Sequence, residues 1–412
     1  MKKKWPSKRI SEIATIKPPK SEARERVPPN ALVSFLPMED LGISTKYPEP
    51  KQTKRLSEVV GSYTYFADGD VLLAKITPCF ENGKVGIAKD LENGVGFGSS
   101  EFFVLRPDCT VSNEWLFHFL SREDFRQEGA LRMSGAVGHK RVPKEFLESC
   151  EIPVPSIPEQ QRIVGVLDKA FEGLATAKAN AEKNLQNARA LFESHLQSVF
   201  TQRGKGWIEK RLGDVCDLQN GYAFKSSDYV GQSKTLNIRM SCIRPGGEFD
   251  SEHNQKFLPD KFAKDYAGFL LKEGDLIIAM TDMAGDPKIL GVPTLVTNLN
   301  GRNFLMNQRV GKLFGFSEDL CIPYLRYFLA TPSTKDFFKS KGAGGLQINI
   351  SKSDILSVVI PIPSLSIQQA IVAQLDALVT HTQELRKLYE QKLAALEALK
   401  KSLLHQAFSG EL

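Results

Sequence analysis

The stretch Ile152-Pro-Val-Pro-Ser-Ile-Pro-Glu-Gln-Gln-Arg-Ile163 returns later in the chain as Ile360-Pro-Ile-Pro-Ser-Leu-Ser-Ile-Gln-Gln-Ala-Ile371. After each copy, apolar side chains recur at alternating steps of four and three residues over a long segment. This spacing is typical of helices that bury one face against another helix. In both places, a short Pro-containing segment therefore leads into a long predicted helix.

The repeat extends over the whole chain. Residues 5–10 (WPSKRI) resemble residues 207–212 (WIEKRL), and residues 68–74 (DGDVLLA) resemble residues 273–279 (EGDLIIA). The offset grows from 202 to 205 over these pairs and then stays at 208 from Ile152 to Phe200. Loops absorb insertions at little cost, whereas an insertion in a packed helix turns every later side chain off its face. We therefore predict two copies of one unit, each a globular module followed by a rigid helix.

The predicted helices lie in a central spacer, residues 156–203, and a C-terminal spacer, residues 363–412. The first is rich in Ala along its seam and the second in large residues, so we expect the two to pack on each other as an antiparallel coiled coil. The alternative is that each helix packs separately on its own module. The predicted helix-to-helix contacts are Ile163, Leu167, Leu174 and Leu191 in the first helix, and Ile371, Leu375, Leu385, Leu396 and Leu403 in the second.

Capping signals mark the ends of both helices. Ser156 with Glu159 forms a predicted capping box for the first helix, and Ser366 with Gln369 forms one for the second. Gly204 and Gly410 follow the predicted ends, where helices commonly stop.

The globular modules, residues 1–155 and 204–362, have the pattern of α+β domains. Predicted strands cover residues 71–74, 101–105, 276–279 and 309–314, predicted helices cover 113–119 and 323–329, and Gly and Pro cluster between them. The expected fold is therefore α+β, with two globular modules joined by two long antiparallel coiled-coil helices in a pseudo-twofold internal repeat.

Composition restricts the class of protein. Of the 412 residues, 42% are hydrophobic and 25% are charged, as in globular proteins, and no apolar run is long enough to span a membrane. The six cysteines are widely separated, which favours free thiols in a cytoplasmic protein. The net charge of +6 permits an anionic partner without requiring one.

Sequence motifs of catalysis are absent. The chain has no phosphate-binding loop, no dinucleotide-binding glycine motif, no zinc-protease motif and no Asn-Pro-Pro-aromatic motif. Ser99-Ser100-Glu101, His118 and His139 could be imagined as catalytic, but isolated residues of these types are usually structural. We predict no catalytic residues and no metal site.

The sequence resembles the specificity subunit of type I restriction-modification enzymes in three features. These are the two Pro-containing stretches, the long helices that follow them and the final segment Gln406-Ala-Phe-Ser-Gly-Glu-Leu412. The resemblance covers the full chain. One departure is Ile367, which stands where the first copy has Glu159 and where the family usually has Glu. This departure weakens only a local capping contact.

The resemblance implies a non-catalytic subunit that reads double-stranded DNA. In the family, two target-recognition domains each contact one half of a split, asymmetric site, and the helices fix the separation of the halves. The implied partners are two methyltransferase subunits and, where the system has them, restriction subunits. No cofactor is expected on this chain, since S-adenosylmethionine and ATP would bind to the partner subunits.

Polar and basic residues in Gly-containing loops are the predicted DNA contacts. Arg and Lys suit guanine edges or phosphate, and Asn and Gln suit adenine. The candidates are Lys75, Thr77, His139, Lys140, Arg141, Asn220, Tyr222, Lys225, Gln308, Arg309, Gln347 and Lys352. Two other classes of function remain open at this point. One is a self-sufficient bipartite DNA-binding regulator, and the other is an enzyme that acts alone on nucleic acid.

Overall fold

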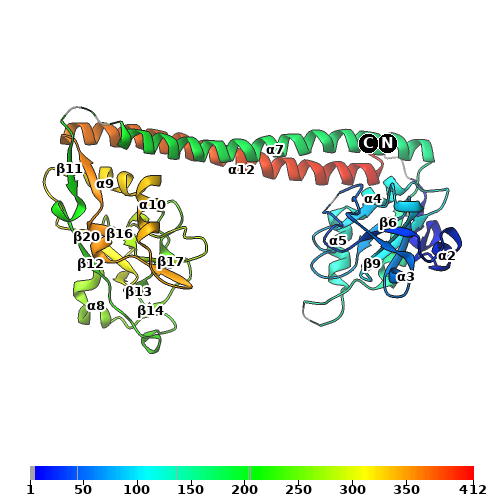
Figure 1. Cartoon of the computed structure of the whole chain (residues 1–412), viewed down its shortest axis with the longest axis horizontal. Coiled ribbons are helices and arrows are strands. Elements are labelled where there is room, and N and C mark those ends of the chain that lie inside the picture. Colours follow the sequence, from blue (N-terminus) through cyan, green and yellow to red (C-terminus); the bar gives the residue numbers. More distant parts are fainter. Residues whose placement is uncertain (1–4, 44, 137, 203, 205) are drawn as a thin grey trace. The chain divides into compact units, whose positions relative to one another are not determined.

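The computed structural model of the chain describes residues 5–43, 45–136, 138–202, 204 and 206–412. Its contacts divide the chain into two compact units. Unit 1 comprises Met1–Glu182 and Glu390–Leu412, and unit 2 comprises Lys183–Tyr389. Each unit therefore combines one globular module with a part of each long helix (Figure 1).

In the described part of unit 1, the module contains two four-stranded sheets and one two-stranded sheet. The first four-stranded sheet has the order β2-β9-β6-β7, the second has the order β4-β3-β8-β5, and β1 pairs with β10. All pairs are antiparallel except β3 with β8. The strands are β1 Ser7–Arg9, β2 Ala14–Ile16, β3 Leu32–Leu36, β4 Gln52–Arg55, β5 Thr64–Ala67, β6 Val71–Ala74, β7 Val85–Ile87, β8 Val95–Gly98, β9 Phe102–Pro107 and β10 Glu151–Pro153.

Helix α4 packs on strands β6, β7 and β9 of the first sheet and carries the buried Trp115 into the core between this sheet and the long helices. Ser112 caps α4 by accepting a hydrogen bond from the Trp115 backbone N–H. The helices are α1 Ile10–Ile13, α2 Ser21–Arg26, α3 Leu56–Val59, η1 Glu92–Gly94, α4 Asn113–Leu120, α5 Glu123–Leu131 and α6 Lys144–Ser149.

The module of unit 2 repeats this topology. Its four-stranded sheets have the orders β12-β20-β16-β18 and β14-β13-β19-β15, β11 pairs with β22, and β17 pairs with β21. The strands are β11 Ile208–Arg211, β12 Asp217–Asn220, β13 Thr235–Ile238, β14 Phe257–Leu258, β15 Leu270–Leu271, β16 Leu276–Ala279, β17 Thr281–Met283, β18 Pro293–Leu295, β19 Asn303–Met306, β20 Val310–Phe314, β21 Gln347–Asn349 and β22 Val359–Ile362. The helices are η2 Leu212–Asp214, η3 Ser226–Asp228, η4 Met240–Cys242, α8 Phe262–Asp265, η5 Ala267–Phe269, α9 Ile322–Leu329, α10 Pro332–Lys341 and α11 Lys352–Leu356.

The local predictions agree with these elements. The predicted strands at residues 71–74 and 276–279 are β6 and β16, and those at 101–105 and 309–314 are β9 and β20 with small shifts of their ends. The predicted helices at 113–119 and 323–329 are α4 and α9, each slightly longer. The α+β assignment and the internal repeat are thus confirmed.

The two long helices are α7, Ile157–Thr201, and α12, Leu365–Ser409. In unit 1, Arg162 near the start of α7 donates a hydrogen bond to the carbonyl of Leu412, and Lys400 lies over the ring of Phe171 further along. Advancing along α7 thus means moving back along α12, so the helices are antiparallel there (Figure 1). In unit 2, Gln374 contacts His195 at 3.2 Å near the opposite ends of the same helices.

Each module packs against both long helices. In unit 1 the ring of Trp115 lies 4.3 Å from that of Phe408 at the end of α12, and in unit 2 the ring of Tyr324 lies 5.1 Å from that of Phe200 at the end of α7. The alternative, that each helix packs only on the module preceding it, is therefore wrong.

The predicted start of the first helix is confirmed, whereas the predicted cap of the second helix is wrong. Helix α7 begins directly after Ser156, as predicted, and Gly410, with φ of 76°, follows the end of α12. Ser366 does not cap the second helix, because α12 begins at Leu365 and the preceding residue is Ser364. The repeat offset of 208 places Ser364, not Ser366, opposite Ser156.

The predicted helix contacts are only partly buried. Ile163, Leu167 and Leu375 are fully buried, while Leu174, Ile371, Leu396 and Leu403 are half-buried. Leu191 and Leu385 are wrong as seam positions, because 66% and 43% of their surfaces are exposed. In α7 the buried face advances four residues from Ala181 to Leu185 and continues through Ala188 and Phe192, so a strict 3.5-residue period does not hold. Leu385 lies in a segment, residues 383–388, whose side chains are all exposed.

A buried glutamine attaches each module to its helix. The side-chain amide of Gln160 accepts a hydrogen bond from the Ser112 backbone N–H at 2.8 Å and donates to the carbonyls of Thr110 and Pro155, both at 2.9 Å. All three partners are main-chain atoms, and the glutamine is completely buried. Its three bonds therefore fix the start of α7 against the loop that precedes α4.

Gln368 makes the equivalent bonds in unit 2. It accepts from the Cys321 backbone N–H and donates to the carbonyls of Asp319 and Pro363, all at 2.8 Å. A ring donor adds to each attachment, since Trp115 Nε1 donates to the Pro153 carbonyl at 2.9 Å and Tyr324 Oη to the Pro361 carbonyl at 2.6 Å. Both modules are thus held on their helices in the same way.

Candidate nucleic-acid interface

Five predicted residues of the first module come together at one edge of the sheet β2-β9-β6-β7. Chain segment 75–77, directly after β6, pairs with segment 140–142 through Thr77 N to Lys140 O and Val142 N to Lys75 O, both at 2.9 Å. Arg141 forms a β-bridge with Ile76 and also pairs with Ser134 across a hairpin. We call this group, Lys75, Thr77 and His139 to Arg141, the first edge.

Charged side chains at the first edge interact with one another and with the neighbouring Glu101. Arg141 binds Glu101 with two nitrogens, Nε at 3.0 Å and Nη2 at 2.7 Å, and its Nη1 donates to the His139 carbonyl at 3.0 Å. The hydrogen bond from Arg141 lowers the pKa of Glu101, which is therefore an anion at neutral pH. Lys75 donates to the Ser100 carbonyl at 2.8 Å. Burial and, to a lesser extent, nearby positive charges lower the pKa of Lys75, although Glu101 opposes this.

Two residues beside the first edge, Glu101 and Lys17, were not predicted as DNA contacts. Glu101 was considered only as part of an unlikely catalytic group, and Lys17 was not considered at all. The backbone N–H of Lys17 donates to the Val104 carbonyl at 2.7 Å, which places it at the end of β2, beside β9. A search of the sequence for clusters of basic residues would not have found Glu101 and Lys17, because strands that are far apart in the chain bring them to this place.

In the second module, Asn220, Tyr222, Gln308 and Arg309 meet at the corresponding edge. Asn220 is the last residue of β12 and pairs with Gly311 of β20. Gln308 N donates to the Tyr222 carbonyl at 3.0 Å, and the Arg309 carbonyl accepts from Met280 N at 2.9 Å. We call Asn220, Tyr222, Gln308 and Arg309 the second edge.

An aromatic cluster supports Tyr222. Its ring centroid lies 4.6 Å from that of Tyr266, 5.0 Å from Phe224 and 5.5 Å from Phe269. With 38% of its surface exposed, Tyr222 presents an oriented aromatic and hydroxyl group at the second edge. Such residues offer contact area at low entropic cost because few torsions need to be fixed.

The other three predicted residues of this module are more dispersed. Gln347 pairs with Met283 in the two-stranded sheet of β17 and β21, and Lys225 is exposed in the loop before η3. Lys352 forms an ion pair with Asp217 at 2.6 Å, at the start of β12 and therefore at the opposite end of that strand from Asn220. The structure does not bring Lys352 to the second edge.

The structure adds Asn349, which the sequence analysis missed. Asn349 and Ala343 exchange two main-chain hydrogen bonds, as Arg141 and Ser134 do, and Ile350 N donates to the Met280 carbonyl at 3.0 Å. Asn349 is thus the structural counterpart of Arg141. Its Oδ1 accepts a hydrogen bond from Thr281 Oγ1 at 2.5 Å.

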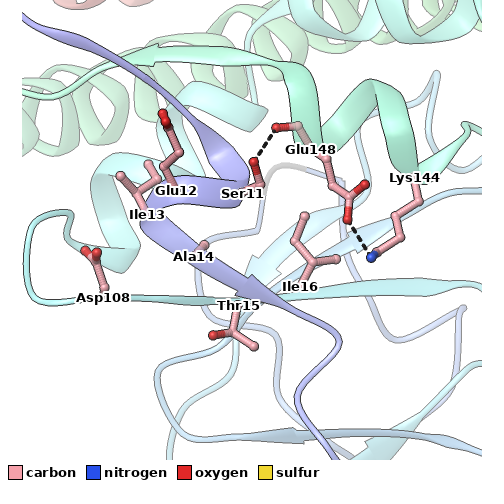
Figure 2. Close-up of a pocket in the computed structure, with 9 residues that line it drawn as sticks. All are labelled: Ser11, Glu12, Ile13, Ala14, Thr15, Ile16, Asp108, Lys144 and Glu148. Atoms are coloured by element: carbon pink, nitrogen blue, oxygen red, sulfur yellow. Dashed lines mark hydrogen bonds and ion pairs between the residues drawn. The ribbon is translucent and has the colours of Figure 1, made fainter.

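A hollow of about 400 Å³ opens beside α1 and β2 in unit 1 (Figure 2). Its lining includes the carboxylates of Glu12, Asp108 and Glu148. Glu12 accepts from the Arg9 backbone N–H, Asp108 from Thr110, and Glu148 pairs with Lys144. Each carboxylate is therefore already engaged, and the hollow has no evident role in chemistry.

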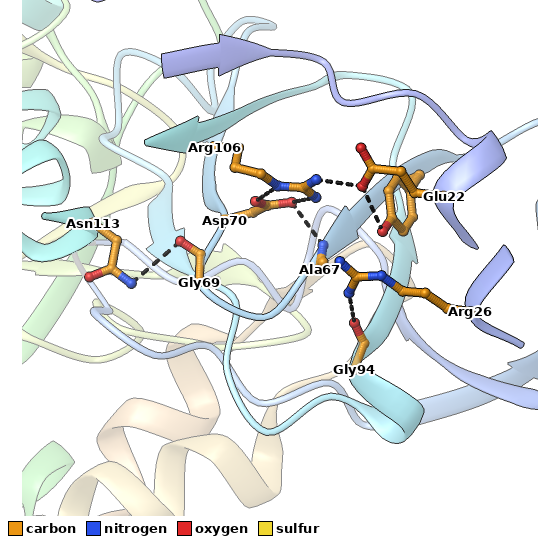
Figure 3. A network of polar contacts seen from close by, with 9 residues as sticks. Glu22, Arg26, Ala67, Gly69, Asp70, Gly94, Arg106 and Asn113 are labelled. Carbon is orange, nitrogen blue, oxygen red and sulfur yellow. Dashed lines mark hydrogen bonds and ion pairs between the residues drawn. The ribbon is translucent and has the colours of Figure 1, made fainter. Parts of the chain in front are cut away.

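A second polar cluster of unit 1 stabilises the module (Figure 3). Arg106 of β9 binds both carboxylate oxygens of the buried Asp70, at 2.7 and 2.8 Å, and also bonds Glu22 of α2. Asp70 in turn accepts from the Ala67 backbone N–H at 2.8 Å. The hydrogen bonds that Arg106 donates to Asp70, opposed by burial, raise the pKa of Arg106. This cluster links α2, β5 and β9 and so braces the two sheets.

Among the residues that the structure describes, no group of three or more His, Cys, Asp and Glu side chains could hold a metal ion. No helix in the described part of the chain is both long and apolar enough to cross a membrane.

Comparison with known proteins places these features in a family. The family model of the type I restriction modification DNA specificity domain matches residues 2–185 and again residues 204–397. Each match covers one module and a large part of the helix that follows it.

Similar proteins carry consistent names. The specificity subunits of the type I restriction enzymes EcoAI and EcoEI of Escherichia coli are each 24% identical to the chain. The EcoAI match covers 86% of this chain and 74% of that protein, and the EcoEI match covers 98% and 81%. The MjaVIII specificity subunit of Methanocaldococcus jannaschii is 26% identical, covering 90% and 85%.

Solved structures show the same fold. One chain, from work on complex assembly and conformational transition of the type I R-M system, has a TM-score of 0.78 at 21% identity, covering 100% of this chain and 99% of that chain. The HsdS subunit of Thermoanaerobacter tengcongensis has a TM-score of 0.62 at 20% identity, covering 100% and 98%. With both halves matched by the family model, the chain belongs to the type I restriction modification DNA specificity family.

Proposed function

We propose that the chain is the DNA-recognition subunit of a type I restriction-modification system, and that it reads a split, asymmetric site with one module for each half. It directs the methyltransferase and restriction subunits to that site and performs no catalysis itself. Double-stranded DNA and these subunits are its partners.

One comparison within the chain carries this proposal. The two modules are attached to their helices by the same bonds of Gln160 and Gln368, yet the counterpart positions at their edges differ. Lys75 and Arg141 of the first module correspond to Met280 and Asn349 of the second. Equal attachment with unequal edges is what a reader of two different half-sites requires, because base contacts rather than phosphate contacts carry sequence information.

The finer assignment of partners belongs to the same proposal. Two methyltransferase subunits would match the twofold repeat, one for each copy of the module and helix. S-adenosylmethionine and ATP would bind to the partner subunits. The relatives are named as specificity subunits of restriction enzymes, which favours this function over a self-sufficient regulator.

Exchange of a module tests the proposal. A chimaera in which residues 1–155 come from another family member is expressed with the methyltransferase subunits, and the methylated motif is sequenced genome-wide. We expect one half of the motif to change and the other half, with the spacing, to stay. The proposal would be contradicted if the chimaera methylated an unchanged motif. It would also be contradicted if the motif methylated with the unaltered chain were not bipartite.

A further inference from the structure

Arg141 occupies a fixed and accessible position at the first edge. Its backbone is held on one side by Ser134 and on the other by Ile76, so the residue cannot shift along the hairpin. Its side chain is 47% exposed. The position combines a rigid backbone with a reachable guanidinium, as a base-reading residue needs.

Glu101 grips one side of this guanidinium. Its carboxylate takes the N–H groups of Nε and Nη2, and the His139 carbonyl takes one N–H of Nη1. A guanidinium has five N–H donors. Among the bonds of the described residues, one N–H on Nη1 and one on Nη2 therefore remain for a ligand, on adjacent nitrogens.

Two N–H donors on adjacent nitrogens match the O6 and N7 acceptors of guanine in the major groove. A phosphate offers similar acceptors, but the charge on Glu101 discriminates between the two. Glu101 is anionic because the Arg141 hydrogen bond lowers its pKa, and it is only 22% exposed, next to the guanidinium. The carboxylate offsets the positive charge of the guanidinium, although Lys75 also lies 4.0 Å from it. The pair therefore attracts a phosphate less than a free arginine would, whereas hydrogen bonds to a neutral base edge are kept.

We infer that Arg141, held by Glu101, reads a guanine in the half-site of the first module. Arg141 is then a residue that determines specificity, and Glu101 is a positioning residue that orients it and disfavours phosphate. The inference rests on the proposed function, since it names the base that one module of such a subunit recognises.

The counterpart in the second module provides an internal comparison. Asn349 has the same main-chain bonds as Arg141, and Thr281 Oγ1 holds its side chain at 2.5 Å. A change at Arg141 should therefore affect one half of the site, and a change at Asn349 the other.

The test uses the full chain expressed with its methyltransferase subunits, and the readout is the methylation of every candidate site in the genome. The variants are Arg141→Gln, Arg141→Lys, Glu101→Gln and Asn349→Ala. Arg55→Gln, which removes an exposed cation from β4 of the same module, is the control. Thermal unfolding of each purified variant shows whether it is folded.

In the half-site of the first module, identified by module exchange, we expect one guanine position at which Arg141→Gln accepts other bases. Its preference for guanine should fall about tenfold or more, the size of a good bidentate contact. Arg141→Lys should keep part of the preference. Glu101→Gln should weaken the preference and increase binding to unrelated DNA, a result that a purely structural role of Glu101 would not produce. Arg55→Gln should leave the motif unchanged.

Two results would overturn the inference. One is a folded Arg141→Gln variant whose methylation falls equally at all sites without relaxing any position, which would make Arg141 a phosphate contact. The other is a first half-site without any guanine. In both cases the unaltered chain would still give a bipartite motif, so the proposed function would stand. Absence of that motif would refute the proposed function instead.

Discussion

The Nε2 atom of His118 lies 3.0 Å from a carboxylate oxygen of Asp168, and this contact joins α4 of the first module to α7. In unit 2, Tyr327 and Asp376 form the equivalent contact, with the tyrosine hydroxyl donating at 2.5 Å. The repeat thus keeps an aspartate on the helix and replaces its ring partner, so a histidine, which titrates near neutral pH, stands in only one of these two contacts.

We expect this difference to appear in the stability of the protein at mildly acidic pH. Burial lowers the pKa of His118, and the hydrogen bond and charge of Asp168 oppose this only in part. Below a pH of roughly 6.5, the ordinary histidine value, the unfolded chain binds a proton that the native chain does not. The free energy of unfolding should therefore fall as pH decreases through this range.

The variant His118→Tyr, which copies Tyr327, isolates this contribution. Lys46, Glu114 and Asp168 surround this position in the unaltered chain and in the variant. The difference between the two in how stability changes with pH therefore reports on the histidine. Urea unfolding at pH 8, 6 and 5 should show a smaller loss of stability in the variant. Equal losses would show that His118 gains its proton without cost.

Replacement of the attaching glutamine should be costly. Gln160→Ala leaves the Ser112 N–H and two carbonyls without partners in a buried place, and each unpaired group costs about 1–3 kcal/mol. We expect a loss of about 2–5 kcal/mol in the free energy of unfolding, measured by urea titration. Gln161→Ala, the exposed neighbour, is the control and should change stability by no more than about 0.5 kcal/mol. A neutral Gln160→Ala would mean that water replaces the amide.

Replacing Arg106 alone should destabilise the first module more than replacing both Arg106 and its partner Asp70. Arg106→Leu leaves Asp70 buried without a cation, at an expected cost of about 3–5 kcal/mol in unfolding measurements. Adding Asp70→Asn removes the uncompensated charge and should recover part of this loss. The exposed pair of Lys89 and Asp90 supplies a control, since Lys89→Leu should cost no more than about 1 kcal/mol. A double variant that is no better than Arg106→Leu would argue against charge burial as the cause.

Truncation of leucines along α7 should separate the buried face from the exposed one. Leu167 is fully buried, and Leu167→Ala should cost about 2–5 kcal/mol in thermal or urea unfolding. Leu191→Ala on the same helix should be nearly neutral, because 66% of the leucine surface is already exposed. Comparable losses for the two would show that Leu191 is buried in solution.

The features that the sequence predicted depend on local patterns. Helical periodicity and the Pro-containing stretch before each long helix are legible along the chain, so α7 and α12 were found with nearly correct ends. The error at Leu191 arose where the pattern is interrupted, at Asn184, because one extra residue in a step moves the buried face by a large angle. The error at Ser366 came from choosing the serine two residues after Ser364, the true counterpart of Ser156 in the repeat.

Contacts between distant segments were not predictable in the same way. Lys75 and Arg141 were each selected as polar residues in loops, but nothing in the sequence shows that segments 75–77 and 140–142 pair or that Glu101 lies between them. Gln160 was noted only as part of a repeated motif. Its partners are backbone atoms, which every residue has, so the sequence does not show which residues it binds. Asn349 became recognisable only when the two modules could be compared bond by bond.

The choice of partners by Gln160 and Gln368 has a consequence for how such proteins diversify. Among the described residues, all partners of the two amides are backbone atoms, so the loops they hold can change nearly every side chain without losing their anchorage. The two glutamines can therefore be kept while the side chains that contact DNA are replaced. A lineage can renew what it recognises while its scaffold stays intact.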